Sequence, residues 1–206
     1  MKHLPFILLA IALCIWISDP FLNALILAIG VGFALYHART DANMSSLCVL
    51  ILSLIFIERF VFYWIPTDNP GGPTVWVNNT IFAVHLLFDF AAKYLIALRA
   101  PIINGYFKRK HLVSSNIHLT KADLAMFFLM RVYIWVDLIA LCENLIRNLE
   151  HLGVPEEFAR QFWDWNWVFY SYPEIKYVLF GLQFLIIWST ISDKMREKSE
   201  QKLLKN

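Results

Sequence analysis

Residues 80–103 read TIFAVHLLFDFAAKYLIALRAPII, an apolar run long enough to cross a lipid bilayer as a helix. A spanning helix needs about 20 residues, because each residue adds about 1.5 Å along the helix axis. Yet this run carries His85, Asp89 and Lys93 at intervals of four residues. The spacing places the three ionisable side chains on one stripe of the helix. The run therefore predicts a membrane helix whose polar stripe faces something other than lipid.

The whole chain has the composition of a membrane protein. Hydrophobic residues make up 59% of its 206 residues, charged residues make up 17%, and the mean hydropathy is +0.54. Soluble domains carry about a quarter charged residues, so this balance does not suit a water-soluble fold. The cysteines lie in apolar runs without paired spacing and give no disulfide framework. We expect a single all-α transmembrane domain over residues 1–206.

Apolar runs divide the chain and predict about six transmembrane helices. They cover residues 4–18, 21–37, 47–66, 80–103, 122–147 and 166–191. The first two are short and are separated by Asp19 and Pro20, which favour a turn, so we expect a short helical hairpin over residues 4–37. The alternative is a re-entrant pair that does not cross. The long runs predict a four-helix polar core over residues 47–191, followed by a basic tail at residues 192–206.

Lysine and arginine are concentrated in alternate connections between the runs. They occur at the N-terminus, in residues 38–46, in residues 104–121 and in the tail, whereas the other connections hold only Arg160. Because connections rich in lysine and arginine stay in the cytoplasm, both termini are expected to be cytoplasmic. The basic cluster Lys108 to Lys110 is typical of contact with anionic lipid, and nucleic acid is not expected as a partner.

The four long runs contain an unusual number of ionisable residues. A charged side chain at the centre of a membrane helix costs about 2.5 to 3.5 kcal/mol on insertion scales. Scattered over lipid-facing surfaces, these groups would make the fold too costly, so we expect them to face one another or a wet cavity. They are Glu58, Arg59, His85, Asp89, Lys93, Arg131, Asp137, Glu143, Glu174 and Lys176.

Three interpretations of this charge network remain open at the level of sequence. The first is structural, since buried ion pairs can fix how helices pack. The second is a proton or ion relay, for which intramembrane acidic residues and histidine are characteristic. The relay residues would be Glu58, Arg59, Asp89, Lys93, Arg131 and Asp137.

The third interpretation is a divalent metal site. An imidazole and a carboxylate one helical turn apart can share a cation, and carboxylates from neighbouring helices can complete the ligand set for zinc or manganese. The candidate ligands are His85, Asp89, Glu58, Asp137 and Glu143. The three interpretations are compatible, because a metal can occupy part of a charge network.

Catalytic and cofactor motifs are absent from the sequence. There is no nucleophile elbow, histidine box or P-loop, which argues against hydrolase chemistry and a bound nucleotide. The other histidines lie near the ends of the runs, so no opposed pair is available for haem. The pattern favours a protein that is not an enzyme, and no catalytic residue is assigned.

The predicted architecture resembles the AciT group of small inner-membrane proteins. The resemblance covers the whole chain and rests on its size, its six spans, its internal termini and its buried charges, namely Glu58, Arg59, His85, Asp89, Lys93, Arg131 and Asp137. It implies a bacterial inner-membrane protein that helps to maintain the proton electrochemical gradient. We therefore expect proton or ion handling within the lipid bilayer. The alternative is a non-catalytic scaffold or accessory subunit of a larger membrane complex, or a homo-oligomer.

Overall fold

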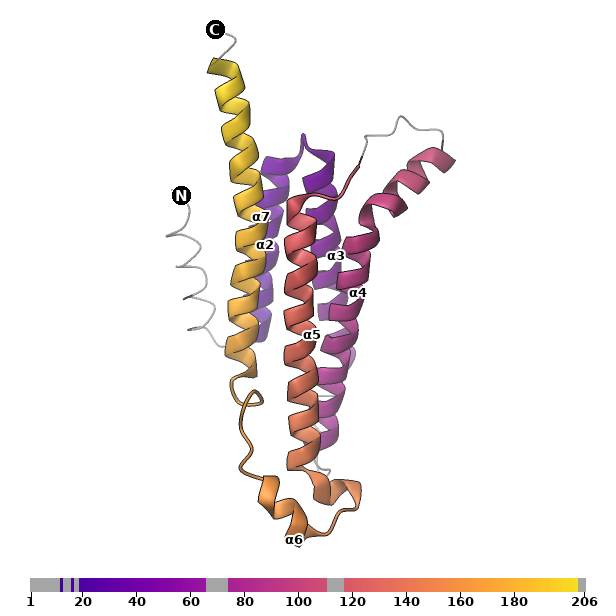
Figure 1. The fold of residues 1–206 in the computed structure, drawn as a ribbon, viewed down its shortest axis with the longest axis vertical. Coiled ribbons are helices and arrows are strands. Elements are labelled where there is room, and N and C mark those ends of the chain that lie inside the picture. Colours follow the sequence, from indigo (N-terminus) through magenta and orange to yellow (C-terminus); the bar gives the residue numbers. More distant parts are fainter. Residues whose placement is uncertain (1–11, 13–15, 17–18, 66–73, 111–116, 204–206) are drawn as a thin grey trace.

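The computed structural model describes residues 12, 16, 19–65, 74–110 and 117–203 (Figure 1). Within these residues the regular structure is entirely helical and no strand occurs, which confirms the predicted all-α class for this part of the chain. The first apolar run, residues 4–18, lies almost wholly outside the described residues.

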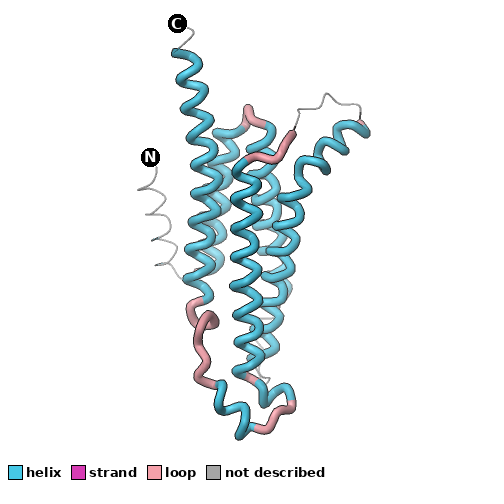
Figure 2. The backbone as a smooth tube through the Cα atoms, viewed as in Figure 1, coloured by secondary structure: helices cyan, strands magenta, loops and turns pink. Residues whose placement is uncertain are grey.

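Five long helices are apolar enough to cross a membrane, as expected of a membrane protein. They are α2 (Pro20–Ala38), α3 (Ala42–Trp64), α4 (Thr74–Arg109), α5 (Lys121–Arg147) and α7 (Tyr172–Leu203). A short turn joins α2 to α3 (Figure 2). The connection from α5 to α7 is longer and contains η1 (Leu149–Leu152), α6 (Glu156–Ala159) and η2 (Arg160–Phe162). Each apolar run from residue 21 onward corresponds to one long helix, but α4 is longer than its run at both ends, and α7 begins later than residue 166 and continues past residue 191.

Polar residues at the predicted turns determine where three of the helices begin. Asp19 accepts hydrogen bonds from the backbone N–H groups of the first turn of α2, and Pro20 occupies its first position. Asp41 caps α3 in the same way. Thr120 and Asp123 form a reciprocal capping box at the start of α5. Each cap satisfies backbone donors that the helix itself leaves without partners.

The five long helices form a closed ring. Helix α2 packs against α3 and α7, α4 packs against α3 and α5, and α5 packs against α7. Figure 1 shows that the α2–α3 turn, the α4–α5 connection and the end of α7 lie together, and we name this the basic end after Arg39, Lys108, Arg109 and Lys121. The α5–α7 connection lies at the opposite end, named the loop end. Helix α4 bends outward near Pro101, which interrupts helical hydrogen bonding.

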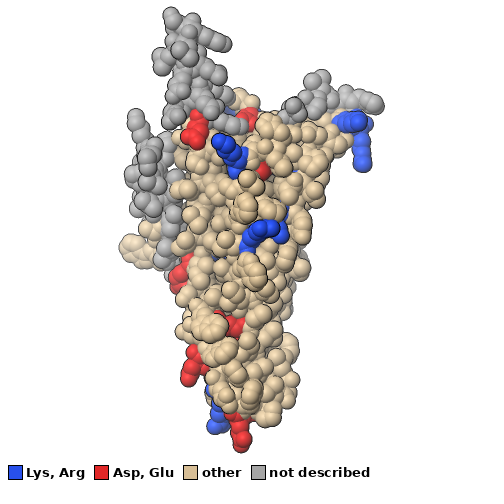
Figure 3. Space-filling model, viewed as in Figure 1, with Lys and Arg blue, Asp and Glu red and all other residues tan. Residues whose placement is uncertain are grey.

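Apolar side chains fill the ring towards the basic end and also cover its outside. The inner core includes Val31, Leu47, Met126 and Ile187, each of which is fully buried. Large apolar side chains also lie exposed on the outer faces of the helices, as a lipid-facing surface requires. Figure 3 shows one face of the molecule, where residues other than Lys, Arg, Asp and Glu form a broad band with a few charged side chains set in it.

Candidate functional site

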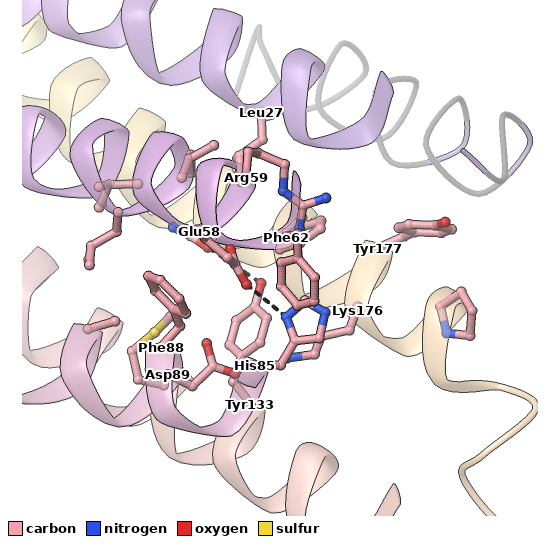
Figure 4. Close-up of a pocket in the computed structure, with 18 of the residues that line it drawn as sticks. Leu27, Glu58, Arg59, Phe62, His85, Phe88, Asp89, Tyr133, Lys176 and Tyr177 are labelled. Atoms are coloured by element: carbon pink, nitrogen blue, oxygen red, sulfur yellow. Dashed lines mark hydrogen bonds and ion pairs between the residues drawn. The ribbon is translucent and has the colours of Figure 1, made fainter. Parts of the chain in front are cut away.

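A cavity of about 500 Å³ lies inside the ring, lined by side chains from all five long helices (Figure 4). Its polar lining includes Glu58 and Arg59 from α3, His85 and Asp89 from α4, and Lys176 from α7. These residues line the cavity from three different helices, so the ring brings together groups that are distant in the sequence. We call the cluster formed by Glu58, His85, Asp89, Asp137, Tyr172 and Lys176 the Asp137 site.

Lys176 lies at the centre of the Asp137 site. Its Nζ atom is 2.6 Å from Asp137 Oδ1 and 2.9 Å from Asp89 Oδ2, and its side chain is only 8% exposed. The ammonium also lies 4.7 Å from the centroid of the Tyr133 ring and 5.4 Å from that of Tyr172. Two carboxylates and two aromatic faces together stabilise a cation that is largely removed from water.

Asp137 is fully buried and unevenly bonded. Its Oδ1 atom accepts a 2.8 Å hydrogen bond from the Tyr172 hydroxyl in addition to the contact with Lys176. Its Oδ2 atom is buried and has no hydrogen-bond partner among the described residues. Because buried carboxylate oxygens nearly always have a donor, this oxygen is a place where a proton or a bound donor group can be accommodated.

Glu58 and His85 form a second ion-pair position at the same level. His85 Nδ1 lies 2.7 Å from Glu58 Oε1, and both side chains are about one fifth exposed. The imidazole packs against the Phe62 ring at 4.5 Å and lies 6.1 Å from the Tyr172 ring. Tyr172 therefore touches both positions, since its hydroxyl binds Asp137 while its ring lies beside His85.

The formal charges of the cluster do not balance when His85 is neutral. Glu58, Asp89 and Asp137 supply three carboxylates, whereas Lys176 and the neighbouring Arg59, which also lines the cavity, supply two formal positive charges. A net charge in a low-dielectric interior is costly. The neutral state of the site thus contains one additional proton, carried by His85 or by a carboxylate, and loss of this proton leaves the site with one net negative charge.

The structure places two predicted relay residues away from the cavity. Lys93 and Arg131 both lie beside the Phe127 ring, at 5.5 and 5.3 Å from its centroid, and Arg131 is exposed on the outer face of α5. No carboxylate of the described chain forms an ion pair with either one. Glu174, at the start of α7, is also exposed.

Glu143 lies outside the cavity lining, and its carboxylate binds the polypeptide backbone. Its Oε1 atom accepts from the N–H of Trp167 at 2.9 Å, while Oε2 accepts from Val168 at 2.8 Å and from Phe169 at 3.3 Å. Glu143 is only 3% exposed. It therefore ties the segment before α7 to α5, which explains why residues from 166 to the start of α7 form a loop.

The remaining candidate metal ligands are engaged with other side chains. His85 is bonded to Glu58, and the ammonium of Lys176 already holds the position between Asp89 and Asp137. In the described part of the chain, no group of three or more His, Cys, Asp or Glu residues has the geometry to hold a metal ion. The binding of zinc or another divalent metal thus stays a prediction. The side chains of His85, Asp89 and Asp137, as they are paired here, do not form a metal-binding set.

A second buried ionic cluster, which the sequence analysis missed, lies towards the basic end. Arg99 donates to both carboxylate oxygens of Asp123, at 2.9 and 2.7 Å. Its remaining donors bind the Asn43 carbonyl at 2.9 Å, the His118 carbonyl at 3.2 Å and the Ser46 hydroxyl. We call these five residues the Arg99 cluster. The Thr120-x-x-Asp123 spacing, which is typical of a capping box, is the signal that marks this part of the sequence.

The sequence analysis also did not single out three residues around the Asp137 site. Tyr172 and Lys176 lie one turn apart at the start of α7, and Lys176 was counted among the intramembrane charges without a role. The Tyr133 hydroxyl donates to Gln183 Oε1 at 3.4 Å between α5 and α7. Tyr133 lies one turn before Asp137, a spacing that places both on one face of α5.

Comparisons with protein-family models, with curated proteins and with solved structures give no match to this chain.

Proposed function

We propose that this chain is an integral membrane protein that handles protons at the Asp137 site and so supports the electrochemical gradient of a bacterial inner membrane. The observation that carries the proposal is the position of Lys176 between Asp89 and Asp137 at the wall of a 500 Å³ cavity. Charged groups at such depth are costly, so their presence beside an open volume favours a role in exchange rather than in packing alone.

We infer that the cavity opens towards the loop end. Asp19, Phe21 and Pro173 line the cavity and are themselves exposed, which indicates the side from which water reaches it. Beyond Lys176, the hydrogen-bonded side chains of Tyr133 and Gln183 provide further polar groups in the cavity lining.

An apolar layer then separates the cavity from the Arg99 cluster. This layer consists of Leu47, Ile51, Ile96, Met126 and Met130. On α3, α4 and α5 these residues lie between the two ionic clusters in the sequence. Transfer across the whole membrane therefore requires this layer to open, and the arrangement described here corresponds to a state that is open at the loop end.

We further propose six spans with both termini in the cytoplasm. The observation that supports this topology is the gathering of basic residues at the end of the ring formed by the α2–α3 turn, the α4–α5 connection and the end of α7. The basic end would then face the cytoplasm, and the cavity would open towards the periplasm.

Proton flux into liposomes tests the proposed function. Purified protein is reconstituted with a pH-sensitive dye inside the vesicles, and a potassium diffusion potential drives protons inward. The wild-type chain should acidify the lumen faster than protein-free liposomes do. Asp89→Asn should reduce the rate to that of protein-free liposomes, because it removes the surplus carboxylate that requires the exchangeable proton. Glu156→Gln is a matched control, since Glu156 is an exposed carboxylate far from the cavity.

Equal flux in the wild-type protein and in Asp89→Asn would overturn the proton-handling proposal. Flux that is lost equally in Glu156→Gln would do the same, because the effect would then not depend on the Asp137 site.

A second candidate function is that of an accessory subunit in a larger membrane complex. The observation that favours it is the pair of cations, Lys93 and Arg131, on the outer face of α4 and α5 without a carboxylate partner in the described chain. An acidic membrane helix of another protein would stabilise both. Purification in mild detergent separates the candidates: a stoichiometric partner supports the subunit role, whereas a lone monomer or homodimer argues against it.

A further inference from the structure

The cavity is larger than proton exchange requires. Protons can pass along hydrogen-bonded side chains and single water molecules, whereas pockets of about 300 to 1,000 Å³ hold drug-sized organic ligands. The volume here is about 500 Å³, and much of the wall is apolar, including Leu27, Ile55 and Ile81. The cavity therefore suits an amphipathic organic molecule better than it suits water or a bare ion.

Aromatic rings line the cavity and already hold cations. The lining includes Phe62, Phe88, Tyr133, Tyr172 and Phe180. The Arg59 guanidinium lies 5.3 Å from the Phe62 ring, and the Lys176 ammonium contacts the faces of Tyr133 and Tyr172. Organic cations are recognised in the same way, through the negative faces of aromatic rings.

The charge of the site selects the sign of the ligand. Glu58, Asp89 and Asp137 exceed the two cations Arg59 and Lys176 by one, and Asp137 Oδ2 has no donor among the described residues. Asp19 also lines the cavity, but its carboxylate is bonded to the backbone N–H groups of the first turn of α2. A bound group with one positive charge balances the cluster, whereas an anion would add to the surplus.

We propose that the cavity binds a monovalent lipophilic organic cation, which replaces the exchangeable proton of the Asp137 site. This inference rests on the proposed function in one respect, namely that the site holds such a proton. Binding one cation releases one proton, so charge is conserved and no other reactant is needed. The chemical class is a bulky cation whose charge is shielded by apolar or aromatic groups.

Competition with a proton makes binding dependent on pH. The titratable and charged groups that face the site lie on α3, α4, α5 and α7, together with Asp19, which caps α2. They are Asp19, Glu58, Arg59, His85, Asp89, Tyr133, Asp137, Tyr172, Lys176 and Tyr177. At low pH the extra proton is present and opposes the cation. As the pH rises the proton leaves, and affinity should increase by up to about tenfold per pH unit for a one-proton exchange.

Two probes of the same size and opposite charge test the inference. Tetraphenylphosphonium and tetraphenylborate have the same shape, and their binding to the detergent-solubilised full chain can be measured by equilibrium dialysis. The phosphonium should bind at one site per chain and more tightly as the pH rises. The borate should bind at least about tenfold more weakly, since one unfavourable charge contact of 1.4 kcal/mol corresponds to that factor.

Variants then locate the site. Asp89→Asn removes the surplus negative charge and should abolish the pH dependence and weaken phosphonium binding about tenfold or more. Ala92→Phe leaves every charge in place but fills part of the cavity that Ala92 lines, and it should also weaken binding. Glu156→Gln, the exposed control, should bind as the wild-type chain does.

Equal binding of the two probes, or phosphonium binding that is independent of pH, would overturn the inference without any variant. Unchanged binding in both Asp89→Asn and Ala92→Phe would overturn it as well. Proton flux without phosphonium binding refutes this inference and leaves the proposed function standing. Phosphonium binding without proton flux refutes the proposed function and leaves the binding site standing.

Discussion

The Arg99 cluster and the Asp137 site are built from the same chemistry and differ in how completely it is satisfied. Arg99 makes hydrogen bonds to Asp123 and to three further acceptors and is only 3% exposed. The Asp137 site borders a cavity, leaves one carboxylate oxygen without a donor among the described residues, and needs an extra proton for neutrality.

Structural and functional charges inside a membrane protein can therefore be told apart by how fully they are hydrogen-bonded. A saturated ion pair gains nothing from further bonds, so it holds helices in place. An unsaturated pair beside an open volume can gain a proton or a ligand. The number of bonds that a charge makes is therefore more informative than its burial.

The largest expected effect is the loss of stability when the Arg99 cluster is broken. Arg99→Leu leaves Asp123 buried without its counter-charge, and removing one partner of a buried pair costs about 3 to 5 kcal/mol. Denaturant unfolding of the purified protein in detergent measures this loss. A loss below about 1 kcal/mol, the range of exposed ion pairs, would show that the cluster does not hold the basic end together.

Asp137→Asn should have a smaller effect on stability and a larger effect on flux. Lys176 keeps Asp89 as its partner, so the cost is one charged hydrogen bond, about 1.5 to 3 kcal/mol. Proton flux in liposomes should fall to the background rate. If Asp137→Asn destabilises the protein as much as Arg99→Leu does and leaves proton flux intact, then the Asp137 site is structural in the same way as the Arg99 cluster.

Glu143→Gln tests a buried carboxylate that is saturated but lies outside the cavity. The amide nitrogen cannot accept the backbone N–H bonds that Glu143 now accepts, so we expect a loss of about 1 to 2 kcal/mol. Hydrogen exchange at Val168 and Phe169 should accelerate as these bonds weaken. Unchanged exchange rates at both amides would show that this carboxylate does not hold the loop.

Arg131→Gln should have the smallest effect. Arg131 is exposed and makes only aromatic contacts with Phe127 and Phe128, so stability should change by less than about 0.5 kcal/mol. Flux in liposomes, where no other protein is present, should equal that of the wild-type chain. A clear loss of flux would support a role for Arg131 in the relay, although Arg131 does not line the cavity.

Much of the fold follows from the sequence because membrane helices are long and apolar. Asp19 and Asp41, at predicted connections, cap α2 and α3 as their turn chemistry suggests. The start of α7 was misplaced, since the apolar and aromatic residues before Tyr172 resemble a span. The loop there depends on Glu143, which is distant in the sequence and cannot be paired with it by local pattern alone.

The site was predictable in part. Convergence of Glu58, His85, Asp89 and Asp137 follows from the cost of isolated charges in lipid. Lys93 does not line the cavity because each step of four residues rotates by about 40°, so that it stands about 80° away from His85 around α4. Arg99 was overlooked because it lies near the end of an apolar run, where basic residues usually reach the headgroups.

The hydrogen bonds between Glu143 and the backbone before α7 affect how α7 can move. These hydrogen bonds attach the segment before α7 to α5, so a tilt of α7 would pivot near its first residue, Tyr172. Lys176 lies about 6 Å along the axis from that pivot and Ile187 about 22 Å, at 1.5 Å per residue. The same tilt thus moves Ile187 nearly four times as far as Lys176. A small rotation can loosen the packing towards the basic end while the ammonium keeps both of its carboxylates.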